Sequence, residues 1–264
     1  MKKGIFRAHK HDFILRYHIK NEAQFISPNH QIISEHPLVE NNELTILVWN
    51  IFKQKRINSL ALLEHYADKT ALILLQEAQA TPKLLNFITE NQKFADQVPA
   101  YSFNDVYAGV MTIANTQALQ AIAFKEREPF IRIPKSALIT KYALPNRQEM
   151  LLVANIHAVN FSFGVKIYHQ QIRILLNEIS QHQGPVILAG DFNSWNRRRL
   201  KLLYYLIRKI NLKAVNFTLD NRKTFMGKPL DFVFYRGLNL MKAEIVDTEA
   251  SDHNGLLVSF RIKG

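Results

Sequence analysis

Acidic, amide and imidazole side chains recur at the ends of apolar, β-prone segments of this chain. Gly190-Asp191-Phe192-Asn193 follows the run 186–189, and Ser251-Asp252-His253 precedes the run 255–260. A rigid sheet can hold side chains in place at its strand ends and still expose them. A carboxylate there can ligate a hard divalent cation, and an adjacent imidazole can transfer a proton or bind a phosphoryl group. Taken alone, the first motif fits a turn equally well, and the second fits a turn better.

A third acidic residue is expected to pair with the second motif. Asp231 begins the strongly β-prone run 232–235, where a carboxylate without a partner is unfavourable. His253 is the partner that we expect. An aspartate bonded to one imidazole nitrogen fixes the tautomer and raises the basicity of the other nitrogen. A general base or a phosphate-binding imidazolium needs both effects.

Two further candidate ligands close neighbouring strands. Trp49-Asn50 ends the run 44–49, Gln76-Glu77 follows the run 71–75, and the segment between has helical periodicity. Such a crossover makes the two strands parallel and brings their C-terminal ends side by side. Glu77 is a natural oxygen ligand for magnesium, and Asn50 can orient a ligand or a phosphate oxygen. A helix-capping role is the competing interpretation of Glu77.

A second imidazole and several basic residues flank the predicted centre. His157 ends the β-prone run 150–156, although a lone histidine is more often structural. Basic residues beside a site that binds a phosphoryl group can bind neighbouring phosphates, and Arg197 is the candidate that we single out. The alternative is the solvated face of an amphipathic helix. The basic residues of these two flanks are Lys53, Lys55, Arg56, Arg197, Arg198, Arg199 and Lys201.

Composition limits the possible chemistry and partners. The 264 residues are 47% hydrophobic, which is sufficient for a large core, and include no cysteine. Disulfides, thiolate metal sites and cysteine nucleophiles are therefore excluded. The formal net charge of +12 attracts polyanions such as nucleic acid or anionic lipid. A role in solubility, or contact with an acidic protein, explains this charge equally well.

The chain lacks the hydrophobic segments of exported and membrane proteins. Its basic start reaches His9 before any apolar stretch long enough for a signal peptide. No later run approaches the roughly 18 apolar residues of a membrane span. We therefore expect a soluble, cytoplasmic protein without a transmembrane segment, and a monomer.

The elements that must position these side chains alternate between strands and helices, as in a layered α/β domain. Residues 1–42 read as an extension packed on a single domain that spans 43–264. Gly184-Pro185 is expected to end one helix as a C-cap glycine followed by a breaker. Helices are predicted at 57–67, from Thr81-Pro82 onward, at 165–183 and at 197–210. Strands are predicted at 44–49, 71–75, 106–113, 118–124, 136–142, 150–156, 186–189, 231–235 and 254–262.

The motifs occur in a recognisable order between residues 44 and 262. This order resembles that of the endonuclease/exonuclease/phosphatase superfamily, and the Gly-Asp-Phe-Asn and Ser-Asp-His elements are its most specific parts. The motifs are Trp49-Asn50, Gln76-Glu77, Gly109-Val110-Met111-Thr112, Asn155-Ile156-His157, Gly190-Asp191-Phe192-Asn193, Leu230-Asp231-Phe232-Val233 and Ser251-Asp252-His253.

The resemblance implies a fold and a set of roles. The fold would be a four-layer αββα sandwich like that of deoxyribonuclease I, with two mixed sheets face to face and helices outside. Glu77 would ligate Mg²⁺, or Mn²⁺ as a substitute, with help from Asn50 and Asp252. Asp231 would orient His253. Asp191 and Asn193 would position water and phosphate, Asn50 and Arg197 would also contact substrate, and His157 would act as an acid or phosphate ligand.

Two departures narrow the branch of the superfamily. Phe52 stands where abasic-site endonucleases carry an acid, and those enzymes lack the histidine that is His157 here. The chain therefore looks more like the deoxyribonuclease, sphingomyelinase and phosphatase branches. The leading hypothesis is a metal-dependent phosphodiesterase or nuclease that acts on DNA or RNA. The alternatives are a sphingomyelinase-like or inositol-phosphate phosphoesterase and a nucleic-acid-binding protein on a degenerate scaffold.

Overall fold

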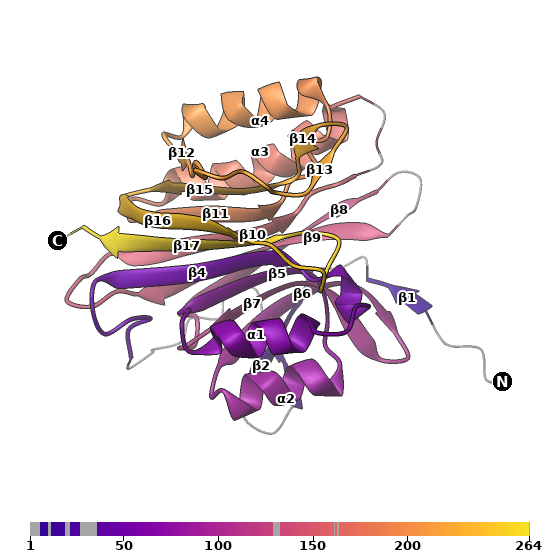
Figure 1. The fold of residues 1–264 in the computed structure, drawn as a ribbon, viewed down its shortest axis with the longest axis vertical. Helices are drawn as coiled ribbons and strands as arrows, with labels where there is room; N and C mark the ends of the chain where they lie inside the picture. The colour runs from indigo at the N-terminus through magenta and orange to yellow at the C-terminus, as the bar shows by residue number, and fades with distance from the viewer. Residues whose placement is uncertain are drawn as a thin grey trace.

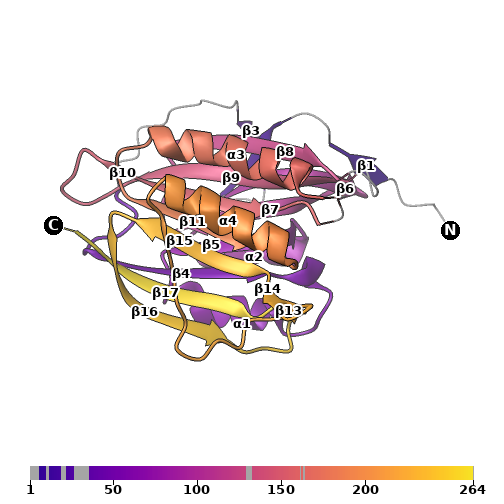
Figure 2. The same cartoon turned by 90° about the horizontal axis from the view of Figure 1, so that it is seen from above.

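In the computed structural model, two β-sheets pack face to face and helices cover their outer faces (Figure 1). The structure describes residues 6–9, 12–18, 22–26, 36–128, 133–160, 162 and 164–263. This arrangement confirms the predicted αββα sandwich. Helices α1 (Ser59–Ala67) and α2 (Pro82–Glu90) cover one sheet, and α3 (Lys166–Gln181) and α4 (Arg197–Lys209) lie side by side over the other (Figure 2).

Both sheets are mixed, with mainly antiparallel neighbours. The nine-stranded sheet has the order β16-β17-β4-β5-β7-β6-β2-β3, and β1 also pairs with β6. Its strands are β1 (Phe6–Ala8), β2 (Ile14–His18), β3 (Glu22–Ile26), β4 (Glu43–Asn50), β5 (Leu72–Gln79), β6 (Phe94–Phe103), β7 (Val106–Ala114), β16 (Leu238–Val246) and β17 (Gly255–Ile262). The six-stranded sheet has the order β12-β15-β11-β10-β9-β8. Its strands are β8 (Gln120–Arg127), β9 (Pro134–Ala143), β10 (Met150–His157), β11 (Val186–Asp191), β12 (Lys213–Ala214) and β15 (Asp231–Arg236), and a separate hairpin pairs β13 (Thr224–Phe225) with β14 (Lys228–Pro229).

The predicted crossover unit is present. Strands β4 and β5 are parallel, and Asn50 lies opposite Gln76 at their C-terminal ends. Helix α1 lies between them in sequence and begins at Ser59, after Asn58 with a positive φ of 68°. Helix α2 begins as predicted, because the Thr81 side chain accepts a hydrogen bond from the backbone of Leu84 and Pro82 occupies the first turn.

Two local predictions need correction. Strand β6 was not predicted, because Pro99 interrupts its sequence; in the structure a register shift between Pro99 and Tyr101 accommodates it. The C-cap role of Gly184 is wrong, since α3 ends at Gln181 and the chain is already extended at His182. A Cβ atom at Gly184 would lie 2.5 Å from the Met150 carbonyl oxygen. Glycine is thus needed there for the close approach of the backbone to β10.

A polar clamp crosses the interface between the sheets. Apolar residues such as Ile46, Val48 and Val153 also pack in this interface. Gln76 of β5 donates a hydrogen bond of 2.7 Å to the side chain of Asn155 of β10, which in turn donates to the carbonyls of Leu75 and Met111. Buried amides of this kind favour one relative position of the two sheets, because a polar group that loses its hydrogen-bond partner inside the protein is unfavourable.

Residues near the N-terminus extend the nine-stranded sheet. Strand β2 pairs with β6 and β3, and β1 pairs with another part of β6. Arg16 of β2 forms a buried bidentate ion pair with Asp96 of β6, at 2.6 and 2.7 Å. Strands β1, β2 and β3 of the predicted extension are therefore hydrogen-bonded into the sheet. None of the described helices is both long enough and apolar enough to cross a membrane.

Candidate active site

An aspartate–histidine pair lies at the centre of the site. His253 precedes β17 in the nine-stranded sheet, and Asp231 begins β15 in the six-stranded sheet. The Nδ1 atom of His253 lies 2.7 Å from Asp231 Oδ2, and both residues are buried. The indole of Trp49 donates a hydrogen bond of 3.0 Å to the His253 carbonyl and holds the backbone of the turn. The pair therefore joins the two sheets.

The neighbouring carboxylates keep His253 charged. Burial alone would lower the pKa of its imidazole. Asp231 opposes burial by its charge and its hydrogen bond, and the charges of Asp191 and Asp252 add to this effect, so that the pKa rises to about 10. His253 is thus an imidazolium at neutral pH, with Nδ1 directed to Asp231 and Nε2 as its second donor.

Asp191 ends β11 directly beside Asp231. The two residues are opposite each other in the β11–β15 ladder, and their carboxylates and His253 offer ligand atoms within 4.8 Å of one another. Burial, and then the Asp231 charge, raise the pKa of Asp191 to about 6. Asn50 donates to Asp191 Oδ2 at 3.1 Å, and the Asn193 backbone donates to Oδ1 at 2.9 Å. This carboxylate is therefore fixed in orientation and close to the acid strength that suits a base at neutral pH.

Local backbone geometry explains the glycine in this motif. Gly190 has φ of 135°, and a Cβ atom there would lie 2.1 Å from the Ile156 carbonyl oxygen of β10. Only glycine permits this contact. Asn193 has a positive φ of 46°, and its side-chain amide donates a hydrogen bond of 2.9 Å to the Ala158 carbonyl. The loops after β10 and β11 are thereby held together.

His157 is neutral and receives a hydrogen bond from a lysine. Its Nε2 atom lies 2.9 Å from Lys135 Nζ and 3.4 Å from Asp191 Oδ2. Burial lowers the pKa of His157 well below its usual value, and the charges of Lys135, His253 and Lys53 lower it further. Because a charged lysine only donates, Nε2 of His157 acts as the acceptor. This geometry favours a positioning or phosphate-contacting role of His157 over that of a general acid.

Glu77 faces the same space from a bulge in β5. Its φ is 55°, and the β5–β7 register shifts between Leu75 and Ala78. Lys53 Nζ lies 2.6 Å from Glu77 Oε2, and Lys135 Nζ lies 4.0 Å from Oε1. Burial alone would lower the pKa of Lys53, but the charge and the hydrogen bond of Glu77 raise it. The predicted ligand is therefore held by two ammonium groups in this structure.

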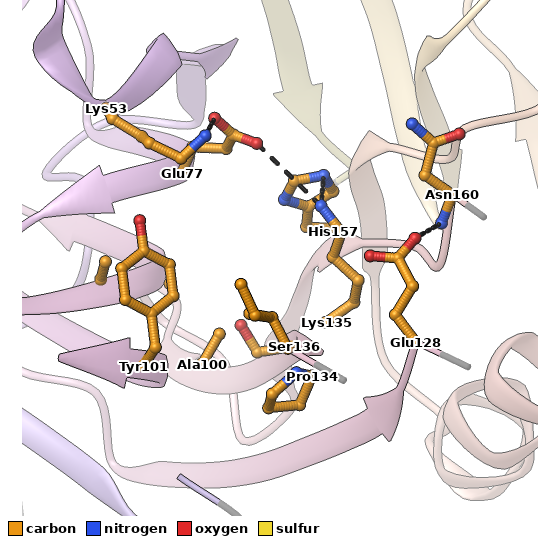
Figure 3. Close-up of a pocket in the computed structure, with 13 residues that line it drawn as sticks. Lys53, Glu77, Ala100, Tyr101, Glu128, Pro134, Lys135, Ser136, His157 and Asn160 are labelled. Atoms are coloured by element: carbon orange, nitrogen blue, oxygen red, sulfur yellow. Dashed lines mark hydrogen bonds and ion pairs between the residues drawn. The ribbon is translucent and has the colours of Figure 1, made fainter. Parts of the chain in front are cut away.

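A cavity of about 420 Å³ lies beside Glu77 and His157 (Figure 3). The charged side chains Lys53, Glu77 and Lys135 line it together with His157. The Tyr101 ring stands on another side of the same space. The remaining lining residues are Ala100, Ala108, Gly109, Glu128, Ile133, Pro134, Ser136 and Asn160.

Glu77 and His157 are the predicted residues that line this cavity, and two of the other predicted residues are exposed. Asp252 is exposed and contacts Ser251 Oγ at 3.3 Å, although its charge still acts on Lys53 and His253. Arg197 is exposed at the start of α4 and lines a different depression with Trp195. The other predicted residues, Asn50, Glu77, His157, Asp191, Asn193, Asp231 and His253, come together at adjoining strand ends of the two sheets.

Arg199 corrects the interpretation of the basic helix. We expected it either on a solvated face or beside substrate phosphates, but its side chain is completely buried. Its guanidinium donates to the carbonyls of Val159, Asn160 and Asn193 and to the Ser162 hydroxyl, at 2.7 to 3.0 Å. Arg199 therefore fastens the loops that follow His157 and Asp191.

Sequence reasoning missed Lys135, Tyr101 and Glu128. Lys135 lies in β9 at no recognised motif, and Glu128 accepts a hydrogen bond of 2.8 Å from the Asn160 backbone. Lys53 had been noted only as one of several basic flanking residues. A lysine near a motif is a weak signal, because its contact depends on the path of the backbone.

The available ligand atoms suit a hard divalent cation. Asp231 Oδ1 is buried and has no hydrogen-bond partner among the described residues, and the carboxylates of Asp231 and Asp191 offer ligand atoms within 4.8 Å of each other. Glu77, Asp252 and the Asn50 side-chain oxygen are the ligands that we predicted, and Asn50 Oδ1 already accepts from the Phe52 backbone at 3.1 Å. All of these donors are oxygens, the ligand type that Mg²⁺ and Mn²⁺ prefer.

Known proteins resemble this chain in sequence or in fold. A "UPF0294 protein" from Erwinia tasmaniensis is 49% identical over 226 residues, covering 86% of this chain and 84% of that protein. ANGEL2, a 2',3'-cyclic phosphatase bound to adenosine-2',3'-vanadate, matches with a TM-score of 0.67 and 16% identity over 88% of this chain and 99% of that chain. The catalytic domain of human Nocturnin with bound sulfate matches with a TM-score of 0.62 and 16% identity over 84% and 96% of the two chains.

The third structure is D. rerio TDP2 in complex with a single-strand DNA product. It matches with a TM-score of 0.57 and 15% identity, over 84% of this chain and all of that chain. At these identities the structures establish the common deoxyribonuclease I-like fold. The model of the Endonuclease/Exonuclease/phosphatase family matches residues 47–253, which include every candidate site residue. This chain therefore belongs to the endonuclease/exonuclease/phosphatase family.

Proposed function

We propose that this protein is a Mg²⁺- or Mn²⁺-dependent hydrolase of phosphodiester bonds in nucleic acid. The observation that carries the proposal is the convergence of Asp191, Asp231 and His253 next to His157, which lines a cavity together with Glu77. An aspartate-bound imidazolium beside a cavity that contains a carboxylate and two ammonium groups suits a reaction that develops negative charge on phosphoryl oxygens. Residues 43–264 would form the catalytic domain, since all of these residues lie within it.

The metal would be held chiefly by Glu77, with Asn50 and Asp252 as further ligands. When bound, it would supply Lewis-acid stabilisation of the phosphoryl group. The protein's own groups would do the rest. Asn50 and the Asn193 backbone hold Asp191 ready to orient the attacking water, and no covalent enzyme intermediate is needed.

The pKa values of Asp191 and His253 indicate which group accepts the proton. With a pKa near 6, Asp191 is ionised at neutral pH and would accept the proton of the attacking water. With a pKa near 10, His253 is a poor base and would instead donate a hydrogen bond from Nε2 to a phosphoryl oxygen. Asp231 would keep that imidazolium oriented through its bond to Nδ1.

Three observations support nucleic acid as the substrate class. The net charge of +12 favours a polyanion, and Lys53 and Lys135 bring positive charge to the cavity. The Tyr101 ring offers a face on which a base can stack. Two proteins of the same fold are complexed with a single-strand DNA product and with adenosine-2',3'-vanadate.

A substrate panel tests the proposal. Purified protein with Mg²⁺ or Mn²⁺ should cleave bis(p-nitrophenyl) phosphate and single-stranded DNA or RNA, and EDTA should abolish the cleavage. Asp191→Asn serves as the inactive control from the same preparation. Cleavage of sphingomyelin or inositol phosphates without cleavage of nucleic acid would overturn the substrate assignment. If no substrate is cleaved in an EDTA-sensitive reaction, the enzyme assignment is overturned. The alternative of a nucleic-acid-binding protein on a degenerate scaffold is then favoured.

A further inference from the structure

We propose that Lys53 is an exchangeable counter-ion of Glu77. In the metal-free protein its ammonium group occupies the position of a cation on Glu77, and a divalent metal displaces it into the adjoining cavity. There it would bind a phosphate oxygen of the substrate together with Lys135. The inference rests on the metal site proposed above and assigns two residues outside the predicted motifs to metal and substrate binding.

The contacts of Glu77 support the competition. Lys53 Nζ lies 2.6 Å from Oε2, and Lys135 Nζ lies 4.0 Å from Oε1, so both carboxylate oxygens face an ammonium group. The Lys53 and Glu77 side chains are 30% and 18% exposed. A divalent cation cannot approach Glu77 closely while Lys53 Nζ remains there, because two cations on one carboxylate oxygen repel each other.

The backbone is built to present Lys53 to Glu77. Phe52, Lys53 and Gln54 have φ of 51°, 56° and 52°, and Glu77 has φ of 55°. Left-handed conformations are unfavourable for residues with side chains and persist only where other contacts impose them. Here the Gln54 side chain exchanges two hydrogen bonds with the Gln79 backbone, at 3.0 and 3.1 Å. This clamp joins the turn to the strand that carries Glu77.

The cavity supplies a destination for the displaced group. Lys53 and Lys135 both line it beside Glu77 and His157 (Figure 3). The flexible lysine stem allows its ammonium to move while the clamped turn stays in place. Once Glu77 binds a metal, the two ammonium groups lose their shared counter-charge. An anion between them restores it, so metal binding and phosphate binding should strengthen each other.

Titration with Mn²⁺ alone tests the displacement. Isothermal titration calorimetry would compare wild type with Lys53→Met, Lys53→Arg and Lys55→Met in phosphate-free buffer. We expect Lys53→Met to bind Mn²⁺ about tenfold more tightly, since it removes the competing cation of a partly exposed ion pair. Lys53→Arg should stay near wild type. Lys55 is an exposed cation two residues away, so Lys55→Met removes the same charge from the turn and should change the affinity little.

Inorganic phosphate tests the second half of the proposal. Wild type should bind phosphate more tightly when Mn²⁺ is present, and Lys53→Met should lose most of this enhancement. Circular dichroism and the Mn²⁺ titration itself verify that the variant is folded. Neither measurement requires turnover, so the readout is separate from catalytic activity.

The outcomes separate this inference from the proposed function. Equal or weaker Mn²⁺ binding by Lys53→Met, in a wild type that binds Mn²⁺, would overturn the exchange and leave the metal site intact. Equal enhancement of phosphate binding by Mn²⁺ in both proteins would overturn the role of Lys53 in substrate binding. Failure of wild type to bind Mn²⁺ would overturn the metal site and the exchange together.

Discussion

Three buried titratable residues of the site have different proton affinities although they are in contact. Burial and Asp231 raise the pKa of Asp191 to about 6. The surrounding carboxylates raise the pKa of His253 to about 10, and burial with Lys135 lowers the pKa of His157 well below its usual value. Separated pKa values of this kind indicate separate roles. The contacts of the three residues thus distinguish a carboxylate that titrates near 6, an imidazolium and a neutral imidazole.

The most direct prediction concerns His253. Replacement by alanine removes the imidazolium and leaves Asp231 as a buried carboxylate without its partner. We expect His253→Ala to lower kcat roughly 10²- to 10⁴-fold, the usual range for a proton-transfer or charge-stabilising group. Steady-state kinetics with bis(p-nitrophenyl) phosphate would measure the change. His182→Ala, at a half-buried histidine beyond the end of α3, is the matched control, and an equal loss there would contradict the assignment.

The same residue makes stability depend on pH in the metal-free protein. Because the pKa of His253 is raised from 6.5 to about 10 on folding, its proton stabilises the folded state. This contribution is complete below pH 6.5 and is lost as the pH rises from 6.5 to about 10. Urea unfolding in EDTA should therefore show a large difference between wild type and His253→Gln at neutral pH. The difference should shrink toward pH 10; a constant difference would argue against the charged imidazole.

Activity should depend on the ionisation of Asp191. Its carboxylate must be deprotonated to accept a proton, so activity should rise with pH. The midpoint of this rise should lie at or below about 6, since a bound cation stabilises the carboxylate and lowers the raised pKa. A profile of kcat/KM against pH measures it. Activity that instead decreases across this range would exclude Asp191 as the base.

At the scale of elements, the site is held by contacts between segments that are distant in sequence. The clamp of Gln76 on Asn155 joins β5 to β10 across the two sheets. Arg199 joins α4 to the loops after β10 and β11. Gln76, Asn155 and Arg199 are not predicted to contact the substrate. They nevertheless determine where His157 and Asp191 lie. Their substitution should therefore affect folding and activity together.

Arg199 gives a measurable case. Arg199→Met keeps the length of the side chain and removes four hydrogen bonds from a buried cation to three carbonyls and a hydroxyl. We expect a loss of about 3 kcal/mol or more in the free energy of unfolding, because buried carbonyls lose charged donors. Urea denaturation would measure it. Arg198→Met, at an exposed neighbouring position, should change stability little, and equal losses would mean that the buried contacts are not responsible.

At the scale of the whole molecule, the excess of positive charge should act on long substrates. With 34 lysines and arginines against 22 acidic residues, the protein should attract a polyanion through a field that salt screens. Cleavage of single-stranded DNA should therefore fall steeply as salt rises, mainly through KM. Cleavage of bis(p-nitrophenyl) phosphate, which carries one charge, should fall much less. Equal salt dependence for both would place the effect in the active site itself.

Much of the centre was predictable because strand ends have a sequence signature. An apolar run followed by Gly-Asp or Gln-Glu indicates both the strand and the polar group at its end. The order of the runs then predicted the parallel neighbours β4 and β5, and the resemblance to the superfamily implied the four layers. For the same reason Asn50, Asp191, Asp231 and His253 were candidates before any contact was known, although their roles stay predictions.

The tertiary structure decided the contacts that no local pattern encodes. Lys135 reaches His157 across 22 positions of sequence, and Lys53 reaches Glu77 across 24. In the sequence Arg199 resembles its solvated neighbours, but its position on helix α4 directs its side chain inward to backbone carbonyls. The sequence by itself thus determined which residue types stand at the strand ends, because strand periodicity is local. Which ammonium groups face those residues was decided only by the turn after β4 and by the pairing of neighbouring strands, because such contacts depend on backbone geometry that no local pattern encodes.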